Sequence, residues 1–542
     1  MILTLISNAT IKSLLQKCKS LKQLKELHAH ILKFSLEENP LIMGPLLSSA
    51  AISKYLSCFS YTQSIFHDLC RRNTFMYNTM LRAYMQSSSP LNSVLCYLDM
   101  LGSGIAGNNY TFPPLIKACT LMGSESMLLG RLVHAHVAKF GFSDDPFIIS
   151  SLIEFYCIFD LDTARRLFNR SNNRDVVMWT ALIDGYGKAW DLESARELFE
   201  KMPERNVISW SAMIAAYSRV GNFKEVLLLF SRMQEEYITP NESVLVSVLT
   251  ACAHLGAITQ GFWVHSYAKR LKFDSNHILA TALIDMYAKC GFVDLGLSVF
   301  DNMPFKDAGA WNALISGFAL SGYARKSLEL FNEMVSSGTQ PTETTFVLLL
   351  TACTHAGLIS EGLKLFEEMG SLYSIEPRME HLACVVDLVA RSGLVSEAEE
   401  FVEKNMGGVE GGDANVWGAL LGACRVHGNV ELGNRIWRRL ADMGINDYGS
   451  HILSYNMYQE AGWEDEAKRV RKLISDGGMS KKPGCSVIEL NGIVEEFLAG
   501  DFRHAKAEEI YRLLNSFSRV VSLEEVHPFV LASHAVSGAF SQ

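Results

Sequence analysis

Histidine and cysteine are the residue types here that could carry metal or nucleophile chemistry, and their spacing argues against it. Two H-x-H pairs occur, His28 with His30 and His134 with His136. On a helix, residues two apart point about 200° away from each other, so one metal ion cannot easily bind both. The 12 cysteines form no C-x-x-C pair, so no zinc or thiol-redox motif is indicated. We expect no metal, no cofactor and no catalytic residue.

Five of the cysteines occupy one slot in similar phrases. They close LLQKC, LIKAC, VLTAC, LLTAC and LLGAC and are Cys18, Cys119, Cys252, Cys353 and Cys424. A small residue that recurs at one place in one kind of helix is typical of buried packing. Cysteines without a pairing pattern also fit a reducing compartment better than disulfide formation.

Length and composition bound the architecture. The chain has 542 residues, of which 49% are hydrophobic and 20% charged. That is too long for one compact core and too apolar for disorder, so a repeat must be considered first. The net charge of −9 removes any general basic-surface argument for nucleic acid, so such an argument must use local placement of charge. The sequence contains no run of 18 apolar residues, so no membrane span is predicted.

Segment 176–206 shows the repeat clearly. Two apolar stripes follow one another at helix spacing, first Trp179, Leu182, Ile183 and Tyr186, then Leu192, Ala195, Leu198, Phe199 and Met202. Pro203 would end the second helix. Neither short helix can bury its stripe alone, so the units must stack, which predicts an all-α solenoid of helix–turn–helix repeats. Related phrases follow at 207–241, 242–276 and 277–307, so the four units from 176 to 307 are 31, 35, 35 and 31 residues long.

The same frame covers residues 8–413 in about twelve units. They are 8–39, 40–73, 74–108, 109–145, 146–175, 176–206, 207–241, 242–276, 277–307, 308–342, 343–378 and 379–413. The glycine-rich insertion GGVEGG (407–412) lacks the Lys-Ser/Thr of a phosphate loop and is expected to be a surface loop. A tetratricopeptide array fits less well, because it keeps 34 residues per unit and a W-x-x-L-G-x-x-Y phrase.

Several phrases carry a family resemblance. Units end as MQEEYITPN, MPERN or MPFKD, and the long ones read LIKAC…GRLVHAHVAKFGF. Over about residues 8–500 the chain resembles plant organellar pentatricopeptide repeat proteins, with long, short and standard motifs. The resemblance implies a right-handed superhelical solenoid that binds single-stranded RNA. Segments 416–440 and 455–501 resemble the extension motifs of the subgroup that acts in C-to-U editing, so residues 414–501 are expected to form that extension.

The resemblance also bears on the chemistry of editing. A deaminase domain of this family needs H-x-E…C-x-x-C to hold zinc and move protons. No cysteine follows Cys485, and His504, His527 and His534 have no Glu two residues on. We expect residues 502–542 to be a truncated tail, the chain not to be an enzyme, and a deaminase to be recruited in trans through 414–501. Residues 1–7 are a possible targeting segment, with the mitochondrion preferred over the chloroplast.

In the family, the fifth and last residues of a unit read one base. The pairs expected here are Asn78/Asn108, Ser150/Asp175, Thr180/Asn206, Ser211/Asn241, Thr281/Asp307 and Asn312/Thr342. By the family's code, Ser or Thr with Asn favours A, Ser or Thr with Asp favours G, and a fifth Asn favours a pyrimidine. Asp suits guanine because its carboxylate accepts from the guanine N–H donors. Long units place Val246 and Val347 at the fifth position and are expected not to read.

Two further columns suggest contacts to RNA. The second residues Phe75, Phe147, Val177, Ile208 and Ile278 could sandwich bases, as in the family, or could simply pack between helices. The thirteenth residues Lys188, Arg219, Lys289 and Arg391 suit a phosphate track, or a solvated helix end with a favourable dipole contact. Acidic residues fall mainly on second helices, which we expect to face outward.

The family's alignment to RNA turns these units into a target. It predicts, from 5′ to 3′, pyrimidine, any, G, A, A, any, G, pyrimidine, any, any, three unread nucleotides, and the edited C. Two alternatives remain: a protein–protein scaffold with a peptide in its groove, and an RNA-binding protein that stabilises or splices transcripts.

Overall fold

The computed structural model describes residues 13–524 apart from 16, 19, 53–57, 70, 88, 173, 272–275, 406–413, 443–447, 477–484, 491–492, 499–501 and 503–505. The predicted targeting segment 1–7, the insertion 407–412, His504, His527 and His534 therefore lie outside the described residues. The chain divides into two compact parts, residues 1–244 and residues 245–542, which we call the N-terminal and C-terminal parts. The predicted all-α repeat fold is confirmed in both.

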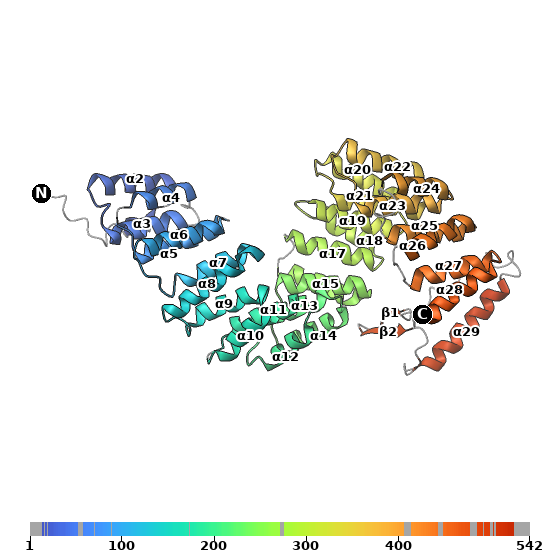
Figure 1. The fold of residues 1–542 in the computed structure, drawn as a ribbon, viewed down its shortest axis with the longest axis horizontal. Helices are drawn as coiled ribbons and strands as arrows, with labels where there is room; N and C mark the ends of the chain where they lie inside the picture. The colour runs from blue at the N-terminus through green and yellow to red at the C-terminus, as the bar shows by residue number, and fades with distance from the viewer. Residues whose placement is uncertain are drawn as a thin grey trace. The chain divides into compact units, whose positions relative to one another are not determined.

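The N-terminal part is a succession of helical hairpins (Figure 1). Its helices are α2 (Leu21–Lys33), α3 (Pro40–Ile52), α4 (Phe59–Asp68), α5 (Thr74–Gln86), α6 (Pro90–Gly102), α7 (Phe112–Leu121), α8 (Met127–Lys139), α9 (Pro146–Phe159), α10 (Leu161–Arg170), α11 (Val176–Lys188), α12 (Leu192–Lys201), α13 (Val207–Arg219) and α14 (Phe223–Glu235), with a 3-10 turn at Gly123–Ser126. The first helices of neighbouring units contact each other, as α9, α11 and α13 do.

The C-terminal part continues the pattern. Its helices are α15 (Glu242–Leu255), α16 (Ile258–Arg270), α17 (His277–Lys289), α18 (Val293–Asp301), α19 (Ala308–Leu320), α20 (Ala324–Ser336), α21 (Glu343–Ala356), α22 (Ile359–Ser371), α23 (Met379–Arg391), α24 (Val395–Asn405), α25 (Ala414–Val426), α26 (Val430–Asp442), α27 (Tyr448–Glu460), α28 (Glu464–Asp476) and α29 (Ala507–Glu524). The region expected to form the extension therefore supplies further helical hairpins, α25–α26 and α27–α28.

One β-hairpin interrupts the helices, and the sequence analysis did not predict it. Strands β1 (Cys485–Leu490) and β2 (Ile493–Leu498) pair antiparallel, with Cys485 opposite Leu498. The intervening Asn491–Gly492 is the commonest signal for a tight hairpin turn, which a search for helical repeats overlooks. Glu489 on β1 accepts the backbone N–H of Thr259 at 3.0 Å, which places the hairpin against the first turn of α16 within the C-terminal part.

An aromatic pair joins successive units. The tryptophan in the fourth position of a unit meets a phenylalanine on the preceding second helix edge to face. Ring centroids are 4.7 Å apart for Phe168 and Trp179, 4.8 Å for Phe199 and Trp210, and 4.6 Å for Phe300 and Trp311. All three tryptophans are buried, as expected for the apolar stripe that contains Trp179. This geometry adds to the burial of apolar area and fixes the distance between units.

The turn between the two helices of a unit needs a left-handed residue. Gly221, Gly291 and Gly322 take φ of 73°, 86° and 81° at the fifteenth position of their units. In unit 176–206 that position holds Trp190, with φ of 66°. A side chain at positive φ costs free energy that glycine avoids, so this turn is strained.

The histidines and cysteines have packing roles. His134 Nδ1 lies 3.0 Å from the Tyr156 hydroxyl and His28 Nδ1 lies 2.8 Å from Tyr61, in each case linking a second helix to the next pair. The predicted buried slot is confirmed for four of the five cysteines, with Cys18 partly exposed. Among the described residues no cluster of His, Cys, Asp and Glu could hold a metal ion, and none of the described helices is long and apolar enough to cross a membrane.

Candidate nucleic-acid interface

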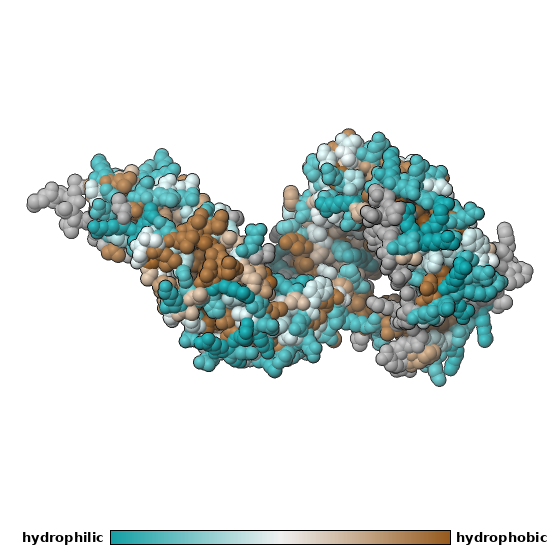
Figure 2. All heavy atoms as spheres, in the orientation of Figure 1, coloured by the Kyte–Doolittle hydropathy of each residue, from teal (hydrophilic) through white to brown (hydrophobic). Residues whose placement is uncertain are grey.

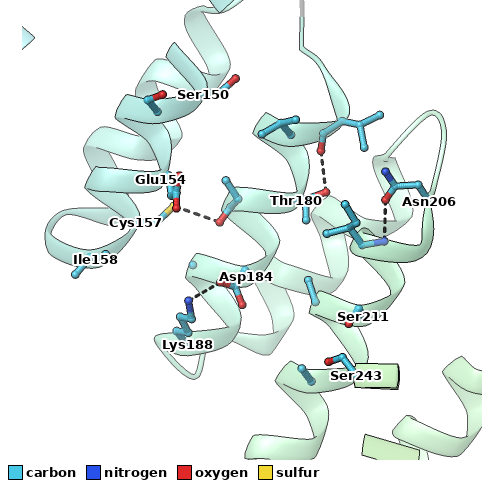
Figure 3. A pocket seen from close by; sticks show the side chains of 18 of the residues that line it. Ser150, Glu154, Cys157, Ile158, Thr180, Asp184, Lys188, Asn206, Ser211 and Ser243 are labelled. Carbon is cyan, nitrogen blue, oxygen red and sulfur yellow. Dashed lines mark hydrogen bonds and ion pairs between the residues drawn. The ribbon is translucent and has the colours of Figure 1, made fainter. Parts of the chain in front are cut away.

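A cavity in the N-terminal part gathers the fifth residues of three successive units. It has a volume of about 600 Å³ and is lined by first helices α9, α11 and α13 and by the residues after them (Figure 3). Ser150, Thr180 and Ser211 line it, together with the last residues Asn206 and Asn241. Fifth residues that are 30 or more positions apart in the chain therefore face the same space. The repeat frame predicts this, because equivalent residues of stacked units should lie on one continuous surface.

The last residue of a unit is the N-cap of the next first helix. Asp175 Oδ1 accepts the backbone N–H of Met178 at 2.8 Å, and Asp307 Oδ1 accepts that of Ala310 at 2.9 Å. Asn206 Oδ1 accepts two N–H groups at 3.0 Å. An N-cap satisfies helix donors that have no other partner. In these last residues the helix binds Oδ1, which leaves the second terminal atom of the side chain for another partner. That atom is an acceptor oxygen in Asp and a donor nitrogen in Asn.

The hydroxyls at the fifth position are oriented by their own helices. Ser150 donates to the carbonyl of Pro146 at 2.8 Å, Thr180 to that of Val176 at 2.8 Å, and Thr281 to that of His277 at 2.9 Å. A hydroxyl whose single proton is used in this way can only accept from a further partner. Adenine and guanine both offer N–H donors to such an acceptor, so this geometry is compatible with the purine preference expected for a fifth Ser or Thr.

In units with a fifth Asn, a hydrogen bond joins the fifth and last residues directly. Asn78 Nδ2 donates to Asn108 Oδ1 at 2.9 Å, and Asn312 Nδ2 donates to Thr342 Oγ1 at 3.2 Å. The expected pairs are thus brought together across 30 residues of chain in both parts. Asn78 and Ser150 are buried, with exposed fractions of 6% and 8%, whereas the other expected fifth residues are partly exposed.

The second column faces solvent. The exposed fractions are 54% for Phe75, 74% for Phe147, 60% for Val177, 58% for Ile208 and 57% for Ile278. Side chains packed between helices would be largely covered, so these exposed fractions favour the stacking alternative, although the Phe75 ring also lies against Gly44. Exposed apolar side chains spaced one per unit offer surfaces against which bases can pack.

The thirteenth-column cations are present but paired. Lys188 lies 2.6 Å from Asp184, Lys289 lies 2.8 Å from Asp285, and Arg391 lies 2.7 Å from Asp387. Arg219 reaches Asp184 from the next unit at 3.6 Å. These ion pairs are solvent-exposed and contribute little stability, about 0–1 kcal/mol each, so a phosphate can displace the carboxylate.

The acidic partners form a column that the sequence analysis missed. Asp184, Asp285 and Asp387 stand at the ninth position, four residues before a cation on the same helix face, and Glu154 stands there in its unit. Glu154 pairs with Lys117 of the preceding unit. The Asp-x-x-x-Lys/Arg spacing is the signal that could have found the column. Charge along this face is consequently close to balanced.

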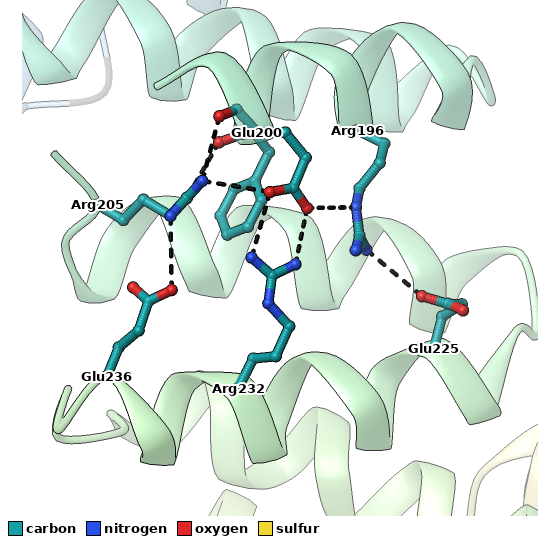
Figure 4. A network of polar contacts seen from close by, with 7 residues as sticks. Arg196, Glu200, Arg205, Glu225, Arg232 and Glu236 are labelled. Carbon is teal, nitrogen blue, oxygen red and sulfur yellow. Dashed lines mark hydrogen bonds and ion pairs between the residues drawn. The ribbon is translucent and has the colours of Figure 1, made fainter. Parts of the chain in front are cut away.

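The acidic residues of second helices belong to structural networks. Glu200 accepts from Arg196, Arg205 and Arg232, and these arginines reach Glu225 and Glu236 in turn (Figure 4). In Figure 2 hydrophilic residues cover the surface around α12, which carries part of this network. The network links α12 to α14. Its acidic residues are paired with arginines and lie away from the fifth-position residues.

In three units the residue before the last is an arginine that stabilises the link to the next unit. Its guanidinium donates to the carbonyl of a phenylalanine six residues earlier and lies over the same ring. The pairs are Arg72 with Phe66, Arg174 with Phe168 and Arg205 with Phe199, with Nε–O distances of 3.1, 3.0 and 3.1 Å. These arginines close the second helix and so fix the position of the last residue of each unit.

Models of known families match this chain along its length. The PPR repeat model matches residues 75–105, 177–207, 208–238, 279–307 and 344–372, and the model described as PPR repeat family matches 306–355. The E motif model matches residues 427–489, which contain α26, α27 and α28 and most of β1.

Relatives and solved structures agree with these matches. The chain is 39% identical to the Arabidopsis thaliana pentatricopeptide repeat-containing protein ELI1, chloroplastic, over 93% of this chain and 79% of that protein. It is 36% identical to a mitochondrial pentatricopeptide repeat-containing protein of the same plant, over 91% and 70% of the two chains. The crystal structure of the pentatricopeptide repeat protein PPR10 from maize superposes with a TM-score of 0.53 at 14% identity, covering 87% of this chain and 80% of that one.

Proposed function

The chain belongs to the pentatricopeptide repeat family and carries an E motif, and from this premise we propose that it is a sequence-specific binding protein for single-stranded organelle RNA that selects a cytidine for C-to-U editing. The observation that carries the proposal is the convergence of fifth and last residues on one face, with each last residue held by a helix cap. A peptide-binding scaffold has no need for such polar pairs in register.

The chemistry of the pairs supports a base preference for each unit. Fifth hydroxyls act as acceptors, and the neighbouring cap presents an acceptor in Asp175 or Asp307 and a donor in Asn206 or Asn241. Guanine offers N–H donors where adenine has a ring nitrogen that accepts. This arrangement supports the assignment of G, A and A to units 146–175, 176–206 and 207–241, and of G to unit 277–307.

The exposed second-column side chains and the cations complete the proposed interface. The former supply stacking surfaces, and Lys188, Arg219, Lys289 and Arg391 supply exchangeable ion pairs for phosphates. This combination of stacking and phosphate contact is typical of proteins that bind single strands. It explains how a chain with a net charge of −9 can bind RNA.

The editing step is assigned to a second protein. The 542 residues contain no C-x-x-C pair, which zinc deaminases use to hold their metal. The E motif and the surrounding extension, residues 414–501, are the proposed recruitment surface for the deaminase. Relatives named as chloroplastic and as mitochondrial support an organellar location for this chain, and the preference for the mitochondrion stays a prediction.

Sequencing of organelle transcripts from plants with and without this protein tests the editing role. Loss of the protein should leave one or a few cytidines unconverted, with the upstream bases G-A-A-any-G at the predicted spacing. If every editing site were unchanged while a transcript end or an intron was altered, the editing role would be wrong and a role in RNA stabilisation or splicing would replace it.

A further inference from the structure

A threonine from the following unit contacts the fifth residue in both units that carry a fifth Asn. Thr111 Oγ1 lies 2.7 Å from Asn78 Oδ1, and Thr345 Oγ1 lies 2.7 Å from Asn312 Oδ1. Both threonines are the third residue of the next unit, and both are completely buried. Each threonine therefore contacts the reading Asn from the buried side.

The main chain limits the possible directions of these hydrogen bonds. The backbone N–H of Asn108 donates to Thr111 Oγ1 at 3.0 Å, and that of Thr342 donates to Thr345 Oγ1 at 2.9 Å. Since a main-chain N–H can only donate, the threonine proton must go to another acceptor. The Asn oxygen is the nearest, at 2.7 Å, compared with 3.2 Å for Asn108 Oδ1 and 3.1 Å for Thr342 Oγ1. A relay runs from backbone N–H through the threonine hydroxyl to the Asn Oδ1 in both units.

The relay decides which end of the amide meets the RNA. Asn108 Oδ1 already accepts the backbone N–H of Tyr110 at 3.1 Å, so the Asn78 atom that faces it must be the nitrogen. Oδ1 then faces the threonine, and Nδ2 keeps one N–H that neither threonine nor Asn108 uses. A pyrimidine has a carbonyl at C2, where adenine has a C–H and guanine an amino donor. The single remaining N–H therefore matches a pyrimidine.

The other units lack this device. Where the fifth residue is Ser or Thr, the third residue of the following unit is Met178, Ser209, Val244 or Ala310. Ser209, the only hydroxyl among them, donates to the carbonyl of Asn206 at 2.8 Å. The threonine relay thus coincides with the fifth Asn, in two units that lie in different parts of the chain.

We infer that Thr111 and Thr345 are specificity-positioning residues, which hold the reading Asn of the preceding unit with its amide N–H toward the base and so give these units their preference for a pyrimidine. This inference rests on the proposed function, because it concerns the same RNA-binding face. The threonines are buried and do not touch the RNA themselves; they act through Asn78 and Asn312.

The test compares Thr345→Val, which keeps the shape and loses the hydroxyl, with Thr345→Ser, which keeps the hydroxyl. The probes are four RNAs of the predicted sequence with U, C, A or G opposite unit 308–342, titrated by fluorescence anisotropy against the full chain. We expect the parent and Thr345→Ser to prefer U and C by about tenfold. Thr345→Val should lose most of that preference because its Asn312 amide can turn.

A second position in the same RNA separates positioning from general damage. The preference for A opposite unit 176–206 should be unchanged in Thr345→Val, whereas a misfolded chain would lose both preferences. If Thr345→Val kept the full pyrimidine preference while Asn312→Ala lost it, the threonine would not position the amide. If the parent chain showed no preference at any position, the proposed function itself would be overturned, and this inference with it.

Discussion

Lys188 and Asp184 form an ion pair of 2.6 Å on the face that carries the fifth-position residues. The two lie one helical turn apart on α11 beside the cavity lined by Thr180 and Asn206. A cation held by an exposed carboxylate is available to a stronger anion, because the exposed pair is weak. In the proposed function, such exchangeable pairs make up the phosphate track.

Removal of one cation should change the salt dependence of RNA binding. For Lys188→Ala we expect the slope of log affinity against log salt to fall by about 0.7, the amount for one phosphate contact with a single strand. Asp184→Asn should strengthen binding to all RNAs without altering base preference. Titrations between 50 and 300 mM salt check both, and an unchanged slope in Lys188→Ala would remove that lysine from the track.

Exchange of the last residues should exchange base preference without affecting the fold. Asp175→Asn should turn the preference of unit 146–175 from G to A by about tenfold, and Asn206→Asp should do the opposite for unit 176–206. Both substitutions keep the Oδ1 cap, and Asn and Asp cap helices about equally well, so the free energy of unfolding should change by less than about 0.5 kcal/mol. Binding to RNAs that differ only at the two bases measures the effect, and weakened binding without exchanged preference would contradict it.

Trp190 offers a test of strain in the repeat turn. Its φ of 66° and exposed fraction of 69% indicate that the backbone is strained while the ring gains little from packing. Trp190→Gly should raise the free energy of unfolding by about 0.5–1 kcal/mol. Gly221→Ala, at the same position of the next unit, should lower it by about 1 kcal/mol. Urea unfolding of the three proteins checks the pair, and equal effects of the two substitutions would argue against strain.

Burial should make one interrepeat bond sensitive to acid. Burial lowers the pKa of His134, and the charge of Arg170 lowers it further. The unfolded chain therefore binds this proton more readily, so the stabilisation is complete above about pH 6.5 and is lost as the pH falls below it. His134→Gln should lose less stability than the parent between pH 7.5 and pH 5, as urea midpoints would show. Tyr156→Phe removes the hydrogen-bond partner but keeps the burial, and so should retain the parent's pH dependence.

The helices and their frame could be predicted from local periodicity, because each unit begins where a cap residue precedes an apolar stripe. Val176, Val207 and Ala308 start both their predicted units and their helices. The expected pairs Asn78/Asn108 and Asn312/Thr342 also meet in the structure. Their roles in RNA binding stay predictions.

Other features depend on geometry that a single stripe does not encode. The threonine relay joins residues 33 positions apart and becomes visible only when two units are stacked. The ion pair between Lys188 and Asp184 was missed because the cations were considered without the residues one helical turn before them. The β-hairpin at Cys485–Leu498 was missed because its alternating pattern is short and lies outside the repeat.

Binding of the full chain to two RNAs tests the central claim most directly. One carries the predicted series of pyrimidine, any, G, A, A, any, G, pyrimidine, and the other is identical except that the G-A-A is replaced by C-U-U. The account predicts tighter binding of the first by at least about tenfold at physiological salt, because three reading pairs lose their matched bases. Equal affinity for the two RNAs would contradict it.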